Sequence, residues 1–171
     1  MIHVLYRHTS NISGFGKSRP SWFSFDKCLE SMLSSIENLD FITFHLLYDG
    51  NYNSTDSRIH HVINFTGGSD WNSYVYTWNY ARNLNIDKND LVFFAENDYM
   101  FVKEWPYKIK ELFEMYSSID YVTLYDHPDK YMNGANPFVE DGGEVTRLML
   151  TNSCHWKISP IHPIMPQQFL V

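Results

Sequence analysis

Apolar positions along the chain fall into short compact runs and longer periodic segments. Compact runs rich in β-branched and aromatic residues predict strands, at 2–7, 41–48, 58–65, 91–95, 121–125 and 145–151. Segments with apolar residues at i, i+3, i+4 and i+7 predict helices, at 25–36, 71–84 and 104–116. Strands and helices therefore alternate over much of the sequence.

The ends of the predicted helices carry signals of their own. Ser24 precedes the first helix and is expected as its N-cap, and Pro106 is tolerated in the first turn of the third. Asn85 follows the second helix where a left-handed C′ residue is common, a conformation that asparagine tolerates. These residues support the boundaries that the apolar spacing predicts.

The order of the elements predicts the fold class. Strands that alternate with helices indicate an α/β protein with an open, mostly parallel sheet flanked by helices. The run 91–95 has no polar alternation, as expected for a strand covered on both faces. In such sheets ligands bind beyond the carboxyl ends of the strands. Three polar clusters follow predicted strands: Thr9-Ser10, Asp49-Gly50 and Glu96-Asn97-Asp98.

Length and charge limit the classes of protein that remain. A chain of 171 residues is expected to form a single domain, 1–171. Its net charge of −7 provides no field that gathers a polyanion, so nucleic acid is not an expected partner. A group of N-terminal cations can still meet one small anion such as a diphosphate, or can be scattered surface charge: Arg7, His8, Lys17 and Arg19.

Cysteine usage and hydropathy indicate the compartment. Cys28 and Cys154 lie far apart without a Cys-x-x-Cys spacing, so neither a disulfide framework nor a zinc site is expected. The chain begins with a predicted strand rather than a signal segment, and no apolar run approaches the roughly 20 residues that span a bilayer. A reducing, cytoplasmic setting without a transmembrane segment is therefore expected.

The stretch "LVFFAENDYMF" places two carboxylates at the end of a predicted central strand. Keeping both Glu96 and Asp98 ionised there costs free energy unless water or a cation compensates their charges. Mg²⁺ or Mn²⁺ suits this position, because such ions are often held by one or two carboxylates together with substrate phosphates. The alternative is an exposed turn whose carboxylates only cap the next segment.

The segment "NSYVYTWNYARNLNIDKNDLVFFAENDYMF", 72–101, resembles GT-A glycosyltransferases, in which a helix carrying Ala-Arg-Asn leads into an apolar strand that ends in the DXD motif. The stretches "IHVLYRHTS" and "FHLLYDG" resemble the first two nucleotide-binding strands of these enzymes. Two later stretches, "SSIDYVTLYDHPDKY" and "LTNSCHWKIS", are similar to bacterial members of the family 2 type. The resemblance implies a GT-A-like (Rossmann-like) fold.

The same resemblance implies a metal-dependent transfer of a sugar from a nucleoside diphosphate-sugar to an acceptor hydroxyl, with a glycan as one acceptor. Asp98 is then the principal ligand of a Mn²⁺ or Mg²⁺ ion and Glu96 its companion. The expected contacts to the nucleotide are Thr9, Ser10, Asp49, Arg82 and Asn97. The sequence departs from the family in having Glu at the first motif position and Asn85 in place of the customary Gly.

An inverting transfer also needs a general base. Five carboxylates of the polar segment 126–144 are candidates, and the sequence does not choose among them: Asp126, Asp129, Glu140, Asp141 and Glu144. His155 is a candidate late metal ligand or phosphate contact, or else a packed, hydrogen-bonded residue. His127 and the pair His60-His61 are weaker candidates.

Two other functions stay open. The first is a noncatalytic GT-A-like module that binds nucleotide, glycan or a partner chain, or a fragment, because many GT-A domains continue beyond a chain of this length. The second is a nucleotidyltransferase, which the first loop disfavours because it lacks that group's glycine-rich signature. Oxidoreductase and hydrolase functions lose weight since the chain has no Gly-x-Gly-x-x-Gly after its first strand and no Gly-x-Ser-x-Gly elbow.

Overall fold

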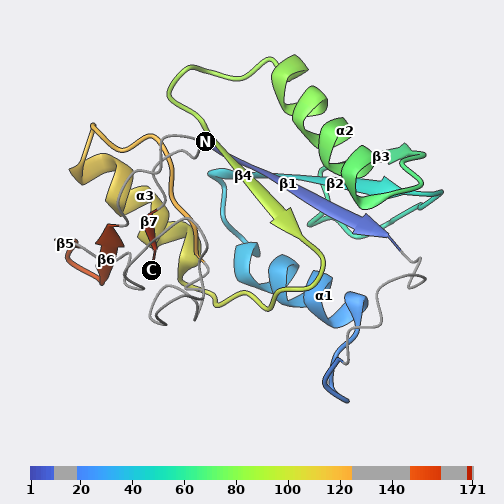
Figure 1. Ribbon diagram of the computed structural model, residues 1–171, viewed down its shortest axis with the longest axis horizontal. Coiled ribbons are helices and arrows are strands. Elements are labelled where there is room, and N and C mark those ends of the chain that lie inside the picture. Colours follow the sequence, from blue (N-terminus) through green and yellow to red (C-terminus); the bar gives the residue numbers. More distant parts are fainter. Residues whose placement is uncertain (10–18, 125–146, 159–168, 171) are drawn as a thin grey trace, which may run out of the picture. The chain divides into compact units, whose positions relative to one another are not determined.

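The structure is a computed structural model that describes residues 1–9, 19–124, 147–158 and 169–170 (Figure 1). The chain divides into two compact units, Met1–Lys103 and Glu104–Val171. Each unit is described by itself below, and a single domain over 1–171 stays a prediction.

The first unit is an α/β fold with a four-stranded parallel sheet. Its strands stand in the order β3-β2-β1-β4, and every neighbouring pair is parallel. The elements follow one another as β1 (Ile2–Thr9), α1 (Phe25–Ile36), β2 (Ile42–Asp49), β3 (His61–Phe65), α2 (Asp70–Asn83) and β4 (Leu91–Glu96). This arrangement is Rossmann-like and confirms the predicted fold class, although β3 begins three residues later than its apolar run.

The two helices cover opposite faces of the sheet (Figure 1). Successive residues of β1 point to opposite faces. On one face, Leu5 packs with Leu47 and Phe65 in a cluster that residues of α2 cover. On the other face, Tyr6 packs against Phe44, with ring centroids 5.7 Å apart. Both faces of β1 are therefore buried in its middle, which explains the continuous apolar run Val4-Leu5-Tyr6.

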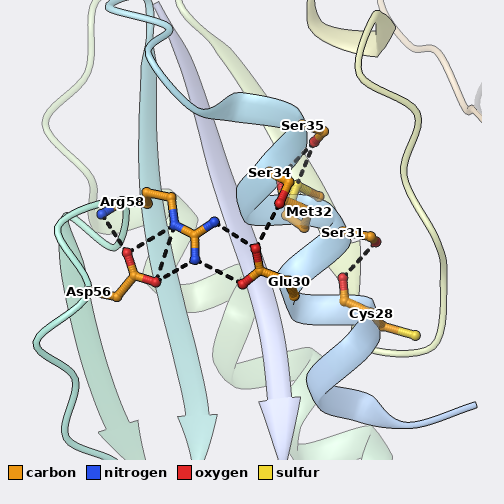
Figure 2. Close-up of polar contacts among 8 residues, drawn as sticks. All are labelled: Cys28, Glu30, Ser31, Met32, Ser34, Ser35, Asp56 and Arg58. Atoms are coloured by element: carbon orange, nitrogen blue, oxygen red, sulfur yellow. Dashed lines mark hydrogen bonds and ion pairs between the residues drawn. The ribbon is translucent and has the colours of Figure 1, made fainter.

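Helix α1 is held at its start and along its length by polar contacts. Ser24 accepts a hydrogen bond from the backbone N–H of Lys27 at 3.1 Å, which confirms it as the N-cap. Figure 2 shows Arg58, which precedes β3, donating to both carboxylate oxygens of Glu30 on α1 at 2.8 Å each. The same guanidinium group is paired with Asp56 at 2.7 Å. This bridge ties α1 to the connection between β2 and β3.

The exit from α2 differs from the prediction. Asn85 is not in the left-handed region, because the chain leaves the helix at Leu84 in an extended conformation (φ −67°, ψ 130°). Leu84 packs against the Leu5 cluster, so the chain turns directly toward the core instead of through a left-handed residue. Among the described non-glycine residues the left-handed one is Asn38 (φ 63°), at the C′ position of α1.

The second unit contains α3 (Trp105–Met115), with Pro106 in its first turn as predicted. Strands β5 (Arg147–Leu150), β6 (His155–Ile158) and β7 (Phe169–Leu170) form an antiparallel sheet in that order. Glu111 of α3 accepts hydrogen bonds from the backbone N–H groups of Asn152 and Ser153 at 2.9 and 3.3 Å. This contact holds the turn between β5 and β6 against the helix.

The predicted strand 121–125 is wrong for the part that the structure describes. Residues 121–124 contain only an isolated bridge residue at Thr123. A β-prone sequence forms a strand only when a partner offers a ladder of hydrogen bonds, and local pattern does not reveal that partner. The described helices include none long and apolar enough to cross a membrane.

Candidate functional site

The register of the sheet brings the predicted polar clusters to one edge. Thr9 lies opposite Asp49 at the carboxyl ends of β1 and β2, and Arg7 lies opposite Glu96 near the ends of β1 and β4. The chain builds β1, β2 and β3 in one direction and then crosses to place β4 on the other side of β1. The carboxyl ends of β1 and β4 are therefore the topological switch point, where ligands of such sheets bind.

Glu96 lies on the α2 face of this edge and is paired with an arginine. The Arg7 guanidinium donates to its carboxylate, and it also lies 3.0 Å from Asp70 Oδ1 and donates to the Asp70 carbonyl at 3.0 Å. Arg7 is largely buried, with 14% of its side chain exposed. The negative charge of Glu96 is thus compensated within the protein, by a residue of the neighbouring strand.

Asp98 lies on the α1 side and is only half paired. Its Oδ2 is 3.6 Å from Arg19 Nη1, whereas its Oδ1 is buried without a hydrogen-bond partner among the described residues. The hydroxyl of the fully buried Tyr6 likewise has no partner in the part of the chain that the structure describes. Burial raises the pKa of Tyr6 and of the Cys28 thiol, and the negative charge of Asp98 raises both further. The Asp98 carboxylate therefore lies close enough to the buried Tyr6 and Cys28 for its charge to affect both groups.

The end of β4 explains why the two carboxylates have different surroundings. Residues two apart in a strand point to the same face. Strand β4 ends at Glu96, however, and 97–98 form a turn that redirects Asp98 toward the side of Tyr6 and Cys28. Glu96 and Asp98 are thus separated, and Glu96 as a companion ligand of one cation stays a prediction.

Asn97, between the two carboxylates, contacts a buried histidine. Its side-chain amide lies 3.3 Å from Nδ1 of His8, so the amide donates to that nitrogen. Burial lowers the pKa of His8. The neutral imidazole also meets the ring of Tyr48 edge to face at 5.4 Å. His8 thereby links the end of β1 to the acidic turn.

Asp49 is used to hold the turn before α2. Its carboxylate accepts hydrogen bonds from the backbone N–H of Gly67 at 2.8 Å, the backbone N–H of Gly68 at 3.2 Å and the hydroxyl of Ser73 at 3.0 Å. Thr9 donates from its hydroxyl to the Asp49 carbonyl at 3.5 Å. Thr9 and Asp49 therefore lie together at the carboxyl edge, and their contact with a nucleoside stays a prediction.

Arg82 is not brought to this edge, and other predicted site residues belong to the second unit or lie outside the described residues. Arg82 lies in the last turn of α2, 12 residues beyond Asp70, which corresponds to roughly 18 Å along the helix. His155 is exposed at the start of β6 and belongs to the second unit. Ser10, Lys17 and His127 lie outside the described residues, as do all the candidate bases: Asp126, Asp129, Glu140, Asp141 and Glu144.

The donor set limits the kind of metal that fits here. Within the described ranges, no group of three or more His, Cys, Asp and Glu side chains is arranged to hold a metal ion. A resident zinc-type cage is thus missing from those ranges. The unpaired, buried Oδ1 of Asp98 does fit a hard cation that takes one protein carboxylate and completes its shell with phosphate oxygens and water.

Sequence reasoning did not pair the cations of this edge with the carboxylates. Arg7 and Arg19 were grouped as N-terminal cations for a small anion, and the structure shows them at Glu96 and Asp98. The signal available for Arg7 was its place in β1, one residue after the fully buried Tyr6 and therefore on the opposite face. Nothing in the sequence indicated that the Tyr6 hydroxyl lies on the side of Asp98, since an aromatic residue in a buried strand is common.

Comparisons of the chain with protein-family models, with curated proteins and with solved structures give no match.

Proposed function

We propose that the carboxyl edge of the parallel sheet binds a nucleoside diphosphate-sugar together with Mn²⁺ or Mg²⁺, and that the protein transfers the sugar to an acceptor hydroxyl. The GT-A resemblance of 72–101 suggested this function. The observation that carries it is the buried, unpaired Oδ1 of Asp98 at the topological switch point. A carboxylate oxygen buried without a partner is costly for folding and is retained where a ligand completes it.

The residues around Asp98 have separate roles in this proposal. Asp98 offers Oδ1 to the cation, while Arg19, at 3.6 Å from Oδ2, is close enough to move onto a phosphate oxygen. Arg7 keeps Glu96 neutralised, so that the edge is not too negative to accept a diphosphate. His8 holds Asn97, and through it the turn, in place.

The bound cation would stabilise the charge that develops on the β-phosphate as the nucleoside diphosphate leaves. The acceptor hydroxyl must lose a proton in the same step if the transfer inverts the anomeric centre. The carboxylates of 126–144 are the candidates for accepting it.

The test is calorimetric binding of UDP and GDP to the purified chain, first with Mn²⁺ and then with EDTA. We expect Mn²⁺-dependent binding that Asp98→Asn weakens at least tenfold, since an amide oxygen is a much poorer ligand for a hard cation than a carboxylate. Asp40→Asn is the matched control, because Asp40 is exposed and precedes β2 at the opposite, amino end of the sheet. Equal binding by the wild-type protein and Asp98→Asn would refute the metal role of Asp98.

A second function is favoured by the arginine pairs. Glu96 and Asp98 each already have an arginine partner, an arrangement that balances charge without a metal. A noncatalytic GT-A-like module that binds nucleotide or glycan would need no more than this. Nucleotide binding that is unchanged by EDTA would favour the module over the transferase.

A further inference from the structure

Helix α2 exposes aromatic residues and buries polar ones. The residues that it buries fully are Ser73 and Thr77, whereas Trp71, Tyr74 and Trp78 are 70%, 44% and 42% exposed. Both buried hydroxyls are satisfied, since the Ser73 hydroxyl lies within hydrogen-bond distance of the Ser69 carbonyl and of Asp49, and Thr77 donates to the Ser73 carbonyl. The side of this helix that carries Trp71, Tyr74 and Trp78 is therefore aromatic where a solvent-facing side is usually polar.

The exposed rings form one continuous surface with a residue of β4. Trp71 stacks on Tyr74 with ring centroids 5.7 Å apart, Tyr74 meets Trp78 edge to face at 6.2 Å, and Trp78 stacks on Phe94 at 4.7 Å. Phe94 is itself 38% exposed. We call Trp71, Tyr74, Trp78 and Phe94 the aromatic strip.

The core of the first unit does not require these rings. The residues of α2 that pack against the buried Leu5 cluster are Tyr76, Tyr80 and Ala81, none of which belongs to the strip. Four large rings that face solvent without serving the core are an uncommon feature, and exposed apolar patches of this kind mark binding sites.

The size of the aromatic strip indicates a small partner. Aromatic residues of this type have about 150–250 Å² of surface each, so exposed fractions of 38–70% leave roughly 400 Å² available. A stable protein interface needs about 800 Å² on each partner. The strip alone is about half of that, which suits a short chain of sugar rings better than a second copy of the protein.

Two carboxylates at one end of the strip indicate which kind of partner it can bind. Asp70 adjoins Trp71, is 72% exposed and is held by Arg7, which also holds the half-exposed Glu96. Carboxylates accept hydrogen bonds from hydroxyl groups. Nucleic acid would stack equally well on the rings, but the net charge of −7 opposes a polyanion.

We propose that the aromatic strip binds a neutral glycan, with the C–H faces of its sugar rings packed on Trp71, Tyr74 and Trp78 and its hydroxyls bonded to Asp70 and Glu96. Because Glu96 lies at the carboxyl edge, a glycan on the strip leads to the candidate nucleotide site. Its role as the acceptor rests on the proposed function, whereas binding to the strip does not.

The experiment uses the full chain and three neutral oligosaccharides: cellohexaose, maltohexaose and chitohexaose. Acrylamide quenching of tryptophan fluorescence first tests whether Trp71 and Trp78 are open to solvent, by comparing the wild-type protein with Trp71→Ala and Trp78→Ala. Calorimetry then measures binding of each sugar. We expect at least one sugar to bind and to protect the strip from acrylamide. We expect Trp71→Ala to weaken binding at least tenfold, because Trp71 is the most exposed ring of the strip and tryptophan is a frequent hot-spot residue.

Two variants serve as controls. Trp22→Ala removes a tryptophan that is 51% exposed and precedes α1, and it should leave sugar binding unchanged. Trp71→Phe keeps a ring at the same position and should retain part of the affinity. UDP binding should be the same in all of these variants, because none of them changes the candidate nucleotide site. If the wild-type protein binds a sugar but no nucleotide, the proposed function is refuted and the proposal for the aromatic strip stands.

Three outcomes would overturn the proposal. Tryptophans of the strip that acrylamide cannot reach in the full chain would show that the protein covers the strip itself. A concentration-dependent dimer in sedimentation that Trp71→Ala dissociates would show that a second copy occupies it. Absence of binding or protection by all three sugars, with the strip open to acrylamide, would show that neutral glycans are not its ligand.

Discussion

The two ends of the parallel sheet differ in how completely their buried polar side chains are satisfied. At the amino end, a chain of hydrogen bonds joins Asp90, His3, His45 and Tyr80, with distances of 3.3, 3.4 and 2.9 Å between successive groups. His61 stacks on His45 with ring centroids 4.6 Å apart. His45 is only 3% exposed, yet both of its ring nitrogens have partners.

The carboxyl end leaves polar atoms without partners. Asp98 Oδ1 and the Tyr6 hydroxyl are buried and unpaired in the described part of the chain, and Glu96 is half exposed. The amino end therefore has polar groups that satisfy one another, whereas the carboxyl end combines satisfied groups, such as the Asp49 carboxylate, with two buried atoms that have no partner among the described residues. Satisfied networks stabilise and specify a fold, and each unsatisfied buried group is an exception that requires its own explanation.

We expect the largest effect when acid protonates His45 at the amino end, which should lower the free energy of unfolding. Burial, and then the neighbouring His61, His3 and His60, lower the pKa of His45 from 6.5 to about 4. The unfolded chain takes up a proton on His45 below about pH 6.5, and the folded protein does so only near pH 4, so stability is full above pH 6.5 and is lost as the pH falls toward 4. At 1.36 kcal/mol per pKa unit the loss is about 3 kcal/mol.

Urea unfolding at pH 7, 6, 5 and 4 measures this loss. His45→Gln, which cannot titrate, should flatten the profile at a lower overall stability, while His155→Gln should retain it because His155 is exposed in the other unit. Identical slopes for the wild-type protein and His45→Gln would mean that His45 does not couple folding to pH.

The next largest effect is expected at the turn that Asp49 holds. A Cβ atom at Gly67 would lie 2.3 Å from Ser73 Oγ and 2.7 Å from Asp49 Oδ2, so Gly67→Ala must displace the carboxylate. We expect a loss of about 2 kcal/mol in the free energy of unfolding, typical of overpacking. Gly68→Asn is the control, since nothing lies within 4 Å there and asparagine tolerates a φ of +69°. Equal stability of Gly67→Ala and Gly68→Asn in urea would show that the hydrogen bonds of Asp49 do not constrain the turn.

The smallest effect on stability is expected for Asp98→Asn. The amide removes the charge from a group whose Oδ1 is buried without a partner among the described residues, and it also removes a weak ion pair between Oδ2 and Arg19 at 3.6 Å, two changes of opposite sign. We expect the free energy of unfolding in urea to change by less than about 1 kcal/mol. Together with the tenfold loss of nucleotide binding, this result would show that Asp98 contributes to binding rather than to stability, unlike His45 at the amino end. A loss of stability as large as that of Gly67→Ala would mean that Asp98 serves the fold.

Elements with strong local signals were predictable from the sequence. Helix α1 matches its predicted range because apolar spacing and the Ser24 cap agree with each other. The run 91–95 became β4 because a continuous apolar stretch suits a strand between two helices. The shared carboxyl edge of Thr9, Asp49 and Glu96 followed from the fold class alone, since parallel strands end at the same side.

The failures have one physical cause. Asn85 was predicted as left-handed because the rule for helix ends is local, but the packing of Leu84 on the core decided the exit from α2. Residues 121–124 have strand-like composition and no ladder. The exposed aromatic side of α2 was not predicted either, because aromatic residues at helical spacing usually indicate burial and give no sign of exposed stacking.

The sequence by itself determined the alternation of strands and helices, the parallel sheet and the edge at which polar residues collect, because these depend on periodicity and on the direction of the chain. Only the tertiary structure decided that Arg7 neutralises Glu96 and that the Asp98 oxygen stays unpaired. It also joined His3, His45 and Asp90 across three segments of the chain. These contacts link residues 42 to 89 positions apart, and such pairs are set by strand order and register, which leave no mark in a local pattern.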